Sequence, residues 1–189
     1  MNLFIDTISS LSIIILFDQN RNILSQDNWI ARWNESSTLI PKIDSFISQN
    51  NLEYSDINNI VIVSGPGSFT WVRTTVLVVN TLAFTLGCKI TPLSYFDLFD
   101  TYPIIKASSR RDCFVQLSIA SDVEIIPNEL LQEHLSEKNI SQIYGEKLEF
   151  LSDQVTIVEK IDYESIIKKV VFEENTRIEP LYIKKPNIS

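Results

Sequence analysis

The stretch VSGPGSFTWVR, residues 63–73, joins the end of a strand pattern to the start of a helix pattern. It follows the β-branched run Ile60–Val63 and precedes the long apolar run Val76–Leu86. The chain has only four glycines, and two of them, Gly65 and Gly67, lie in this turn. Because glycine adopts backbone conformations that other residues avoid, we expect a sharp strand-to-helix turn here. A strand–helix–strand unit of this kind predicts parallel pairing, and so an α/β fold.

The order of predicted elements extends this unit over the first hundred residues. Short apolar and β-branched runs predict strands over 3–5, 12–17, 23–29, 60–64 and 90–92. Apolar residues at helical spacing predict a helix over 39–50, and a long apolar run predicts a second over 68–86 that Gly87 ends. Ser36, Ser37 or Thr38 can cap the first helix. The resulting β-β-β-α-β-α-β order matches the ribonuclease-H-like half-domain found in actin, sugar kinases and Hsp70-type ATPases.

The second half gives weaker patterns. We expect a hairpin over 114–119 and 123–126, a helix over 128–135, a strand over 154–158, a helix over 163–172 and an extended tail over 177–185. The chain is therefore divided into a ribonuclease-H-like domain over 1–100 and a smaller α/β domain over 101–189.

Composition excludes several classes of protein. With 44% hydrophobic residues and 21% charged residues, the 189-residue chain is typical of a globular protein. Its net charge of −8 argues against a protein whose main task is to grip nucleic acid. The two cysteines, Cys88 and Cys113, and the single histidine, His134, are too few for a zinc site. We expect reduced thiols and a solvated His134 on a polar helix beside Glu133.

The N-terminus favours a cytoplasmic location. No basic segment precedes its apolar residues, and Asp6 and Asp18 interrupt the apolar stretch. This pattern is typical of neither a signal peptide nor a membrane span.

Two interpretations of the glycine turn are open. The free N–H groups at a helix N-terminus can bind an anion, with Ser68 or Thr70 as cap. However, no lysine follows the glycines, so the turn is not a Walker A loop, and a purely structural turn is the alternative. Arg73 lies in the first turn of the helix, where a cation needs a carboxylate such as Asp6 or a bound anion. Asp6 could instead hold Mg²⁺ through water or cap a turn.

Both predicted helices carry apolar stripes. The first helix has Leu39, Ile43, Phe46 and Ile47 on one face, and the second has Val72, Val76, Val79, Ala83 and Leu86. Leu77, Val78, Leu82 and Phe84 fall elsewhere on the second helix. A helix that is apolar nearly all round is either buried or docks against a partner, and both interpretations stay open.

These motifs together resemble the TsaB (YeaZ) family. The resemblance rests on Ile5-Asp6-Thr7, Gly65-Pro66-Gly67-Ser68-Phe69-Thr70, Val72-Arg73, Leu82-Ala83, Gly87, Ser94, Arg111-Asp112-Cys113-Phe114-Val115 and Pro180-Leu181-Tyr182-Ile183-Lys184. It covers nearly the whole chain and is strong up to about residue 100. It departs from the family at Trp71, where glycine is usual, and at Thr74, Val76, Val78 and Asn80, where small residues are usual.

The resemblance implies an actin-like (ASKHA) fold with a reduced second domain, and a degenerate ATPase. It implies a non-catalytic subunit that dimerises with TsaD and works with TsaE to transfer threonylcarbamoyl to the adenosine beside the tRNA anticodon. The chain alone would bind no cofactor or metal, the complex would use ATP, and tRNA would be held indirectly. The docking surface would be the two helices of the first domain, through Leu39, Ile43, Phe46, Ile47, Trp71, Val72, Val76, Val79 and Ala83.

The residues favour a non-catalytic role independently, since only Gly87 and Gly145 are left to build a second phosphate loop and an adenosine pocket. Two alternatives stay open. One is a small self-sufficient actin-fold enzyme, kinase-like or peptidase-like, and the other is a homodimeric binding protein.

Overall fold

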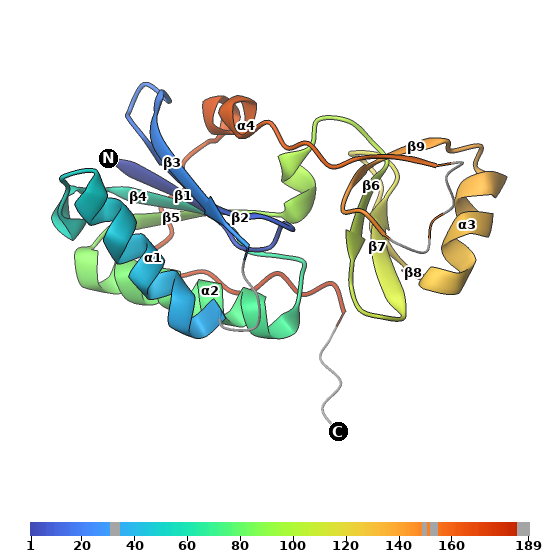
Figure 1. Cartoon of the computed structure of the whole chain (residues 1–189), viewed down its shortest axis with the longest axis horizontal. Coiled ribbons are helices and arrows are strands. Elements are labelled where there is room, and N and C mark those ends of the chain that lie inside the picture. Colours follow the sequence, from blue (N-terminus) through green and yellow to red (C-terminus); the bar gives the residue numbers. More distant parts are fainter. Residues whose placement is uncertain (31–34, 149–150, 152–154, 185–189) are drawn as a thin grey trace.

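The computed structural model describes residues 1–30, 35–148, 151 and 155–184. Two five-stranded sheets lie one after the other along the long axis of the molecule (Figure 1). Several helices pack against the first sheet and one helix against the second. The α/β fold of actin-like type that the sequence predicts is confirmed, including the β-β-β-α-β-α-β order of the first sheet and its helices.

The first sheet has the strand order β3-β2-β1-β4-β5. Its strands are β1 (Asn2–Asp6), β2 (Ser12–Phe17), β3 (Ile23–Trp29), β4 (Asn59–Val63) and β5 (Lys89–Leu93). The central strand β1 pairs antiparallel with β2 and parallel with β4. Because β1 and β2 are covered on both faces, they are buried along their whole length, whereas the edge strand β3 alternates half-buried and exposed residues.

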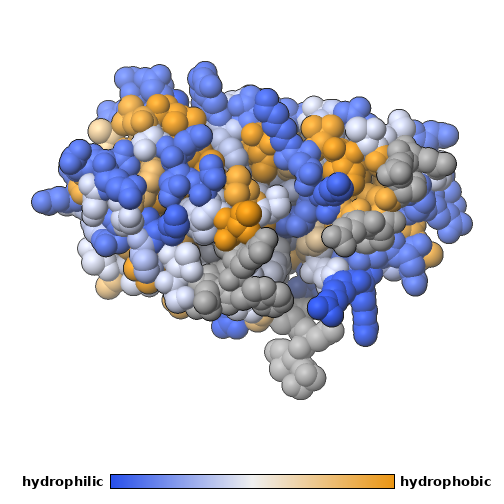
Figure 2. Space-filling view, viewed as in Figure 1, coloured by the Kyte–Doolittle hydropathy of each residue, from blue (hydrophilic) through white to orange (hydrophobic). Residues whose placement is uncertain are grey.

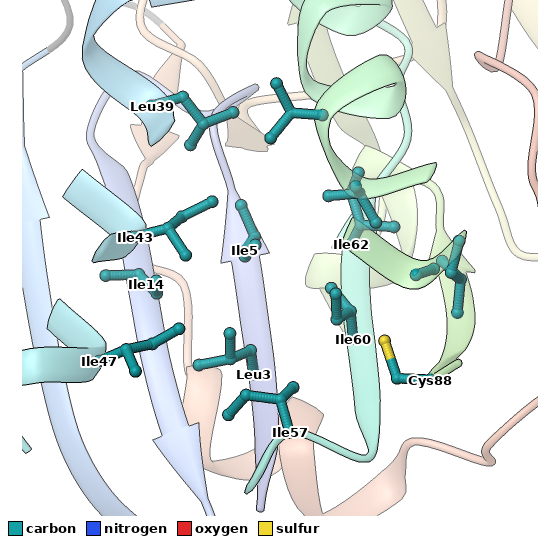
Figure 3. Packing of buried hydrophobic residues seen from close by; sticks show 14 of the residues in the cluster. Leu3, Ile5, Ile14, Leu39, Ile43, Ile47, Ile57, Ile60, Ile62 and Cys88 are labelled. Atoms are coloured by element: carbon teal, nitrogen blue, oxygen red, sulfur yellow. The ribbon is translucent and has the colours of Figure 1, made fainter. Parts of the chain in front are cut away.

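Two long helices, α1 (Glu35–Gln49) and α2 (Phe69–Leu86), cover one face of this sheet (Figure 1). Leu39, Ile43 and Ile47 of α1 point toward the side chains of β1 and β2 (Figure 3). α2 ends where the sequence predicts, because Gly87 adopts the left-handed conformation (φ +69°) and its N–H donates to the Ala83 carbonyl.

The predicted start of α1 is wrong. The helix begins at Glu35, so Ser36, Ser37 and Thr38 lie within its first turn and do not precede it.

The opposite face is covered by the short 3₁₀ turn η2 (Tyr95–Leu98) and by α4 (Tyr163–Lys169). Phe4 and Phe17 of the sheet, Tyr95 of η2 and Ile167 of α4 belong to one apolar cluster. The first sheet is therefore the middle layer of three, and its second helical layer includes residues from far along the chain.

The second sheet has the order β10-β9-β6-β7-β8. Its elements are β6 (Ile104–Ala107), β7 (Asp112–Gln116), β8 (Val123–Pro127), α3 (Asn128–Glu137), β9 (Gln142–Gly145) and β10 (Thr156–Val158). The predicted hairpin is present as β7 and β8, and the predicted helix as α3. The sequence analysis missed β6 and β9, because each has only four residues and no alternating pattern. Gln154, in the predicted strand over 154–158, lies outside the described residues.

After α4, residues 171–184, which we call the C-terminal strap, run along the first sheet and beside α2 toward the second sheet (Figure 1). Asn175 bridges Ile90 of β5, and the Leu181 N–H donates to the Ser64 carbonyl at 2.9 Å. The helix predicted over 163–172 ends earlier, at Lys169. The predicted tail reaches Lys184 within the described residues, and Lys185 lies outside them.

Candidate functional site at the glycine turn and the cleft between the sheets

The glycine turn between β4 and α2 is packed on both sides by other parts of the chain. Gly65 has a φ of +132°, and a Cβ atom built on it would lie 2.6 Å from the Leu181 carbonyl oxygen of the strap. A Cβ atom on Gly67 would lie 2.9 Å from the Ile8 Cγ2 atom. These contacts favour the structural interpretation of the turn, because its missing side chains make room for the strap and for the β1–β2 turn.

The predicted cap of α2 is not formed. Ser68 occupies the N-cap position, but its side chain makes no capping hydrogen bond. Thr70 is the second residue of the helix and is exposed.

Asp6, at the end of β1, caps a turn. Its buried carboxylate accepts hydrogen bonds from the Ile8 N–H (2.8 Å), from the Ser9 N–H (3.0 Å) and Oγ (2.6 Å), and from the Tyr163 hydroxyl (2.9 Å). Burial, and then the Asp6 carboxylate, raise the pKa of Tyr163 well above its usual value. Asp6 therefore fixes the β1–β2 turn and attaches α4 to the first sheet.

The predicted ion pair between Asp6 and Arg73 is wrong. The Asp6 carboxylate is already surrounded by four donors, and Arg73 is exposed, with its guanidinium 5.0 Å from the centre of the Phe69 ring. Asp6 also lies in no metal cluster, since the described residues contain no group of three or more His, Cys, Asp or Glu that could hold an ion. Its neighbour Thr7 is buried and shares a 2.6 Å hydrogen bond with Thr75 of α2.

A cleft of about 290 Å³ lies between the two sheets, beside the glycine turn. Its lining is rich in hydroxyl groups: Ser9, Ser10, Ser12, Ser68, Ser108 and Ser109. Trp71, where the sequence departs from the resembled family, is half-buried and lines this cleft.

Lys106 of β6 crosses the cleft between the sheets. Its buried Nζ donates to the Ile8 carbonyl at 2.7 Å and to Glu146 Oε2 at 2.8 Å, and lies 4.8 Å from the Tyr95 ring centre. The Lys106 charge is thus already paired, and this lysine joins the second sheet to the β1–β2 turn. The cleft can hold a polar group, but Lys106 offers it no free cation for a phosphate.

The helix residues predicted to contact a partner have a different environment from the one expected. Eight of the nine are buried in the core of the chain itself: Leu39, Ile43, Phe46, Ile47, Val72, Val76, Val79 and Ala83. They hold α1 and α2 on the sheet, so these eight side chains are not exposed to another protein.

The apolar side chains that α1 and α2 do expose are others. Leu77 is 67% exposed and Phe84 is 88% exposed on α2, and Ile40 is 51% exposed on α1. The signal was present in the sequence, because Leu77 and Phe84 lie seven residues apart, outside the main stripe of α2. By length and composition alone α2 could cross a membrane, but its other face packs on β4 and β5.

The remaining candidate residues are structural. His134 is half-buried, with its Nε2 3.5 Å from Glu124 Oε2, so the expectation of a solvated histidine is wrong. Cys88 and Cys113 are buried and free, and burial raises the pKa of the Cys113 thiol to about 12. A thiol that stays protonated is a poor nucleophile.

Comparisons with known proteins agree with this architecture. A family model described as TsaD, tRNA N6-adenosine threonylcarbamoyltransferase, matches residues 29–99. A curated relative, the tRNA threonylcarbamoyladenosine biosynthesis protein TsaB of Bacillus subtilis (strain 168), is 32% identical over 78 residues. That alignment covers 38% of this chain and 34% of the relative, so it spans about a third of the relative's length.

Two solved structures share the fold. YeaZ from Pseudomonas aeruginosa is 17% identical and superposes with a TM-score of 0.57 over 67% of each chain. An uncharacterized protein with similarity to peptidase YeaZ from Pseudomonas aeruginosa is 16% identical, with a TM-score of 0.70 over 97% of this chain and 99% of the other.

The two sheets and the cleft between them define a protein of the actin-like α/β class. Within this class, the chain is similar in sequence to TsaB over 38% of its length and shares the fold of YeaZ.

Proposed function

We propose that this chain is a non-catalytic scaffold subunit of the complex that attaches threonylcarbamoyl to the adenosine beside the tRNA anticodon. The observation that carries the proposal is the exposed apolar face of α2, formed by Leu77 and Phe84. Side chains this large and this exposed are typical of a surface that another protein covers. The similarity to TsaB of Bacillus subtilis supports the link to tRNA modification.

The residues beside the cleft support the absence of catalysis. The Asp6 carboxylate is taken up by four donors, and Lys106 is paired with Glu146. In the described part of the chain neither group is free to act as a general base or to bind a phosphate.

The similarity to TsaB also supports the partners that we propose. TsaD is the partner that covers the α2 face as a heterodimer, and TsaE joins the complex. ATP is used by the complex and not hydrolysed by this chain. The net charge of −8 supports a complex in which the partners hold most of the tRNA. We place this assembly in the cytoplasm.

Co-purification with the cognate TsaD, followed by tRNA modification in vitro, tests the proposal. Phe84→Asp places a charge on the α2 face and should abolish the complex and the modification. Ile119→Asp is the matched control, because Ile119 is 82% exposed beyond the end of β7, in the second half of the chain. This control should leave both unchanged. Failure of the wild-type chain to bind TsaD would overturn the proposal, and so would ATP turnover by the chain alone.

The same α2 face favours a homodimer as the second candidate. Sedimentation of the chain, alone and with TsaD, distinguishes the homodimer from the TsaD heterodimer. A homodimer that dissociates in the Phe84→Asp variant, and that persists when TsaD is added, would indicate a self-associating binding protein.

A further inference from the structure

A second cleft lies where the C-terminal strap meets the start of α2 and β7, and we call it the strap cleft. Its volume is about 290 Å³, and its lining includes Phe69, Arg111, Tyr182 and Lys184. The strap reaches this place from the first sheet and ends beside the second (Figure 1). Residues from three distant parts of the sequence therefore form one concave surface.

One wall of the strap cleft is aromatic. The rings of Phe69 and Tyr182 lie with their centres 5.2 Å apart and their planes tilted by 30°. Both residues stay partly open to solvent, Phe69 at 39% and Tyr182 at 38% exposed. An exposed pair of rings offers a face on which a further planar group can stack.

The rim of the strap cleft is cationic. Arg73 lies over the Phe69 ring and Arg111 lines the cleft, and neither has an ion-pair partner among the described side chains. Lys184 donates to Asp112, which neutralises the one carboxylate in the lining. In a chain with a net charge of −8, this rim carries an excess of positive charge.

We propose that the strap cleft binds a nucleoside phosphate, either as a free nucleotide or as one residue of a single-stranded RNA. The base stacks on the Phe69–Tyr182 pair, and the phosphate accepts hydrogen bonds from Arg73 and Arg111. A small molecule that carries both a planar ring and an anion can contact the aromatic wall and the cationic rim together. An acidic peptide would contact only the cations of the rim. This site goes beyond the proposed function, in which the chain holds no ligand of its own.

Titration calorimetry of the isolated full chain at low ionic strength tests the site with AMP, adenosine, inorganic phosphate and a short single-stranded RNA. AMP should bind at least about tenfold more tightly than adenosine or phosphate, because it alone engages both wall and rim. If the RNA binds more tightly than AMP, and added salt weakens its binding, the ligand is a nucleotide within single-stranded RNA. If the RNA binds as tightly as AMP or less tightly, the ligand is the free nucleotide.

Variants locate the binding on the structure. Arg73→Ala, Arg111→Ala and Tyr182→Leu should each weaken AMP binding about tenfold. Lys138→Ala, which removes an exposed cation at the end of α3, should change it less than about twofold. Arg73 and Arg111 are exposed, so their variants keep the fold, and thermal melts verify this.

Four results overturn the proposal: no binding of AMP or RNA, unchanged binding by both arginine variants, equal binding of phosphate and AMP, or equal binding of an acidic peptide. None of them depends on whether the chain forms a complex with TsaD.

Discussion

Gly65 and Leu181 approach each other so closely that a Cβ atom on Gly65 would lie 2.6 Å from the Leu181 carbonyl oxygen. Next to this contact, the Leu181 N–H donates to the Ser64 carbonyl at 2.9 Å. The glycine turn is thus the place where the C-terminal strap is fixed to the first sheet. The turn that starts α2 and the segment that completes the strap cleft hold each other in position.

Gly65→Ala should lower the free energy of unfolding by about 3 kcal/mol. The alanine meets two penalties, a φ of +132° and a contact with backbone atoms that cannot rotate away. Urea denaturation followed by circular dichroism measures the change.

Gly87→Ala is the control for this prediction. Gly87 also has a positive φ, +69°, but a Cβ atom there meets nothing within 4 Å. Its cost should therefore be only about 1 kcal/mol, the cost of the left-handed backbone. Equal losses in the two variants would show that the strap contact contributes nothing.

The position of this turn could be predicted from the sequence, but its contact with the C-terminal strap could not. Two glycines between a strand pattern and a helix pattern mark a sharp turn wherever they occur. What fills the space that they leave is the strap, whose residues lie far along the chain and have no helix or strand periodicity. Local spacing holds no information about such a contact.

The helix stripes show the same limit. Periodicity correctly grouped Leu39, Ile43 and Ile47 on one face of α1, and it did not reveal that this face is covered by the chain's own sheet. A stripe that packs on a sheet and one that packs on a partner have the same spacing. The surface that distinguishes them, Leu77 and Phe84, became visible only when both layers were in place.

Lys106→Met should lower the free energy of unfolding by about 2 kcal/mol. The Lys106 side chain is 6% exposed and Glu146 is 24% exposed. The variant leaves the Glu146 carboxylate with the Ala107 N–H but without its cation, and removes the lysine donor from the Ile8 carbonyl. Because Lys106 joins the second sheet to the β1–β2 turn, we also expect faster hydrogen exchange of the Ile8 and Ser9 amides.

Lys42→Met provides the comparison. Lys42 pairs with Asp27 at 3.2 Å, but both side chains are more than a third exposed, at 35% and 40%. An exposed pair of this kind contributes less than about 1 kcal/mol. If Lys106→Met lowers the free energy of unfolding no more than Lys42→Met does, the prediction for Lys106 is wrong.

Asn80→Ala should loosen the C-terminal strap. The Asn80 side chain donates to the Ile178 carbonyl at 2.9 Å and accepts from the Ile178 N–H at 3.0 Å, so one residue of α2 holds one residue of the strap twice. Loss of both bonds should lower the free energy of unfolding by about 1–2 kcal/mol.

Limited trypsin digestion gives a second measurement of the strap, because Arg177 precedes the held residue. Cleavage there should be faster in Asn80→Ala than in the wild type. Thr81→Ala, at the next position of α2, removes only an exposed bond to the Leu77 carbonyl and should leave the rate unchanged. Equal digestion of all three proteins would contradict a strap held by Asn80.

Tyr163→Phe should make the chain less sensitive to alkali. Burial and the Asp6 carboxylate raise the pKa of Tyr163 in the folded chain, whereas the pKa of a tyrosine in the unfolded chain is about 10. Below this value both states keep the phenolic proton, and the group gives no pH dependence. Above it only the unfolded chain releases the proton, so each such tyrosine lowers stability by about 1.4 kcal/mol per pH unit.

The phenylalanine variant keeps the edge contact with the Phe4 ring, at 5.5 Å between centres, and loses the 2.9 Å hydrogen bond to Asp6. At pH 8 it should be less stable by about 2 kcal/mol, the contribution of a hydrogen bond to a charged group. Between about pH 10 and pH 11 its stability should fall less steeply than that of the wild type. Tyr95, whose pKa burial also raises, continues to titrate in both proteins, so the slope decreases without vanishing. Urea denaturation midpoints of the wild type and the variant, measured across this pH range, test the prediction. If the stability of both proteins falls with pH at the same slope, the Tyr163 phenol loses its proton as easily in the folded chain as in the unfolded one.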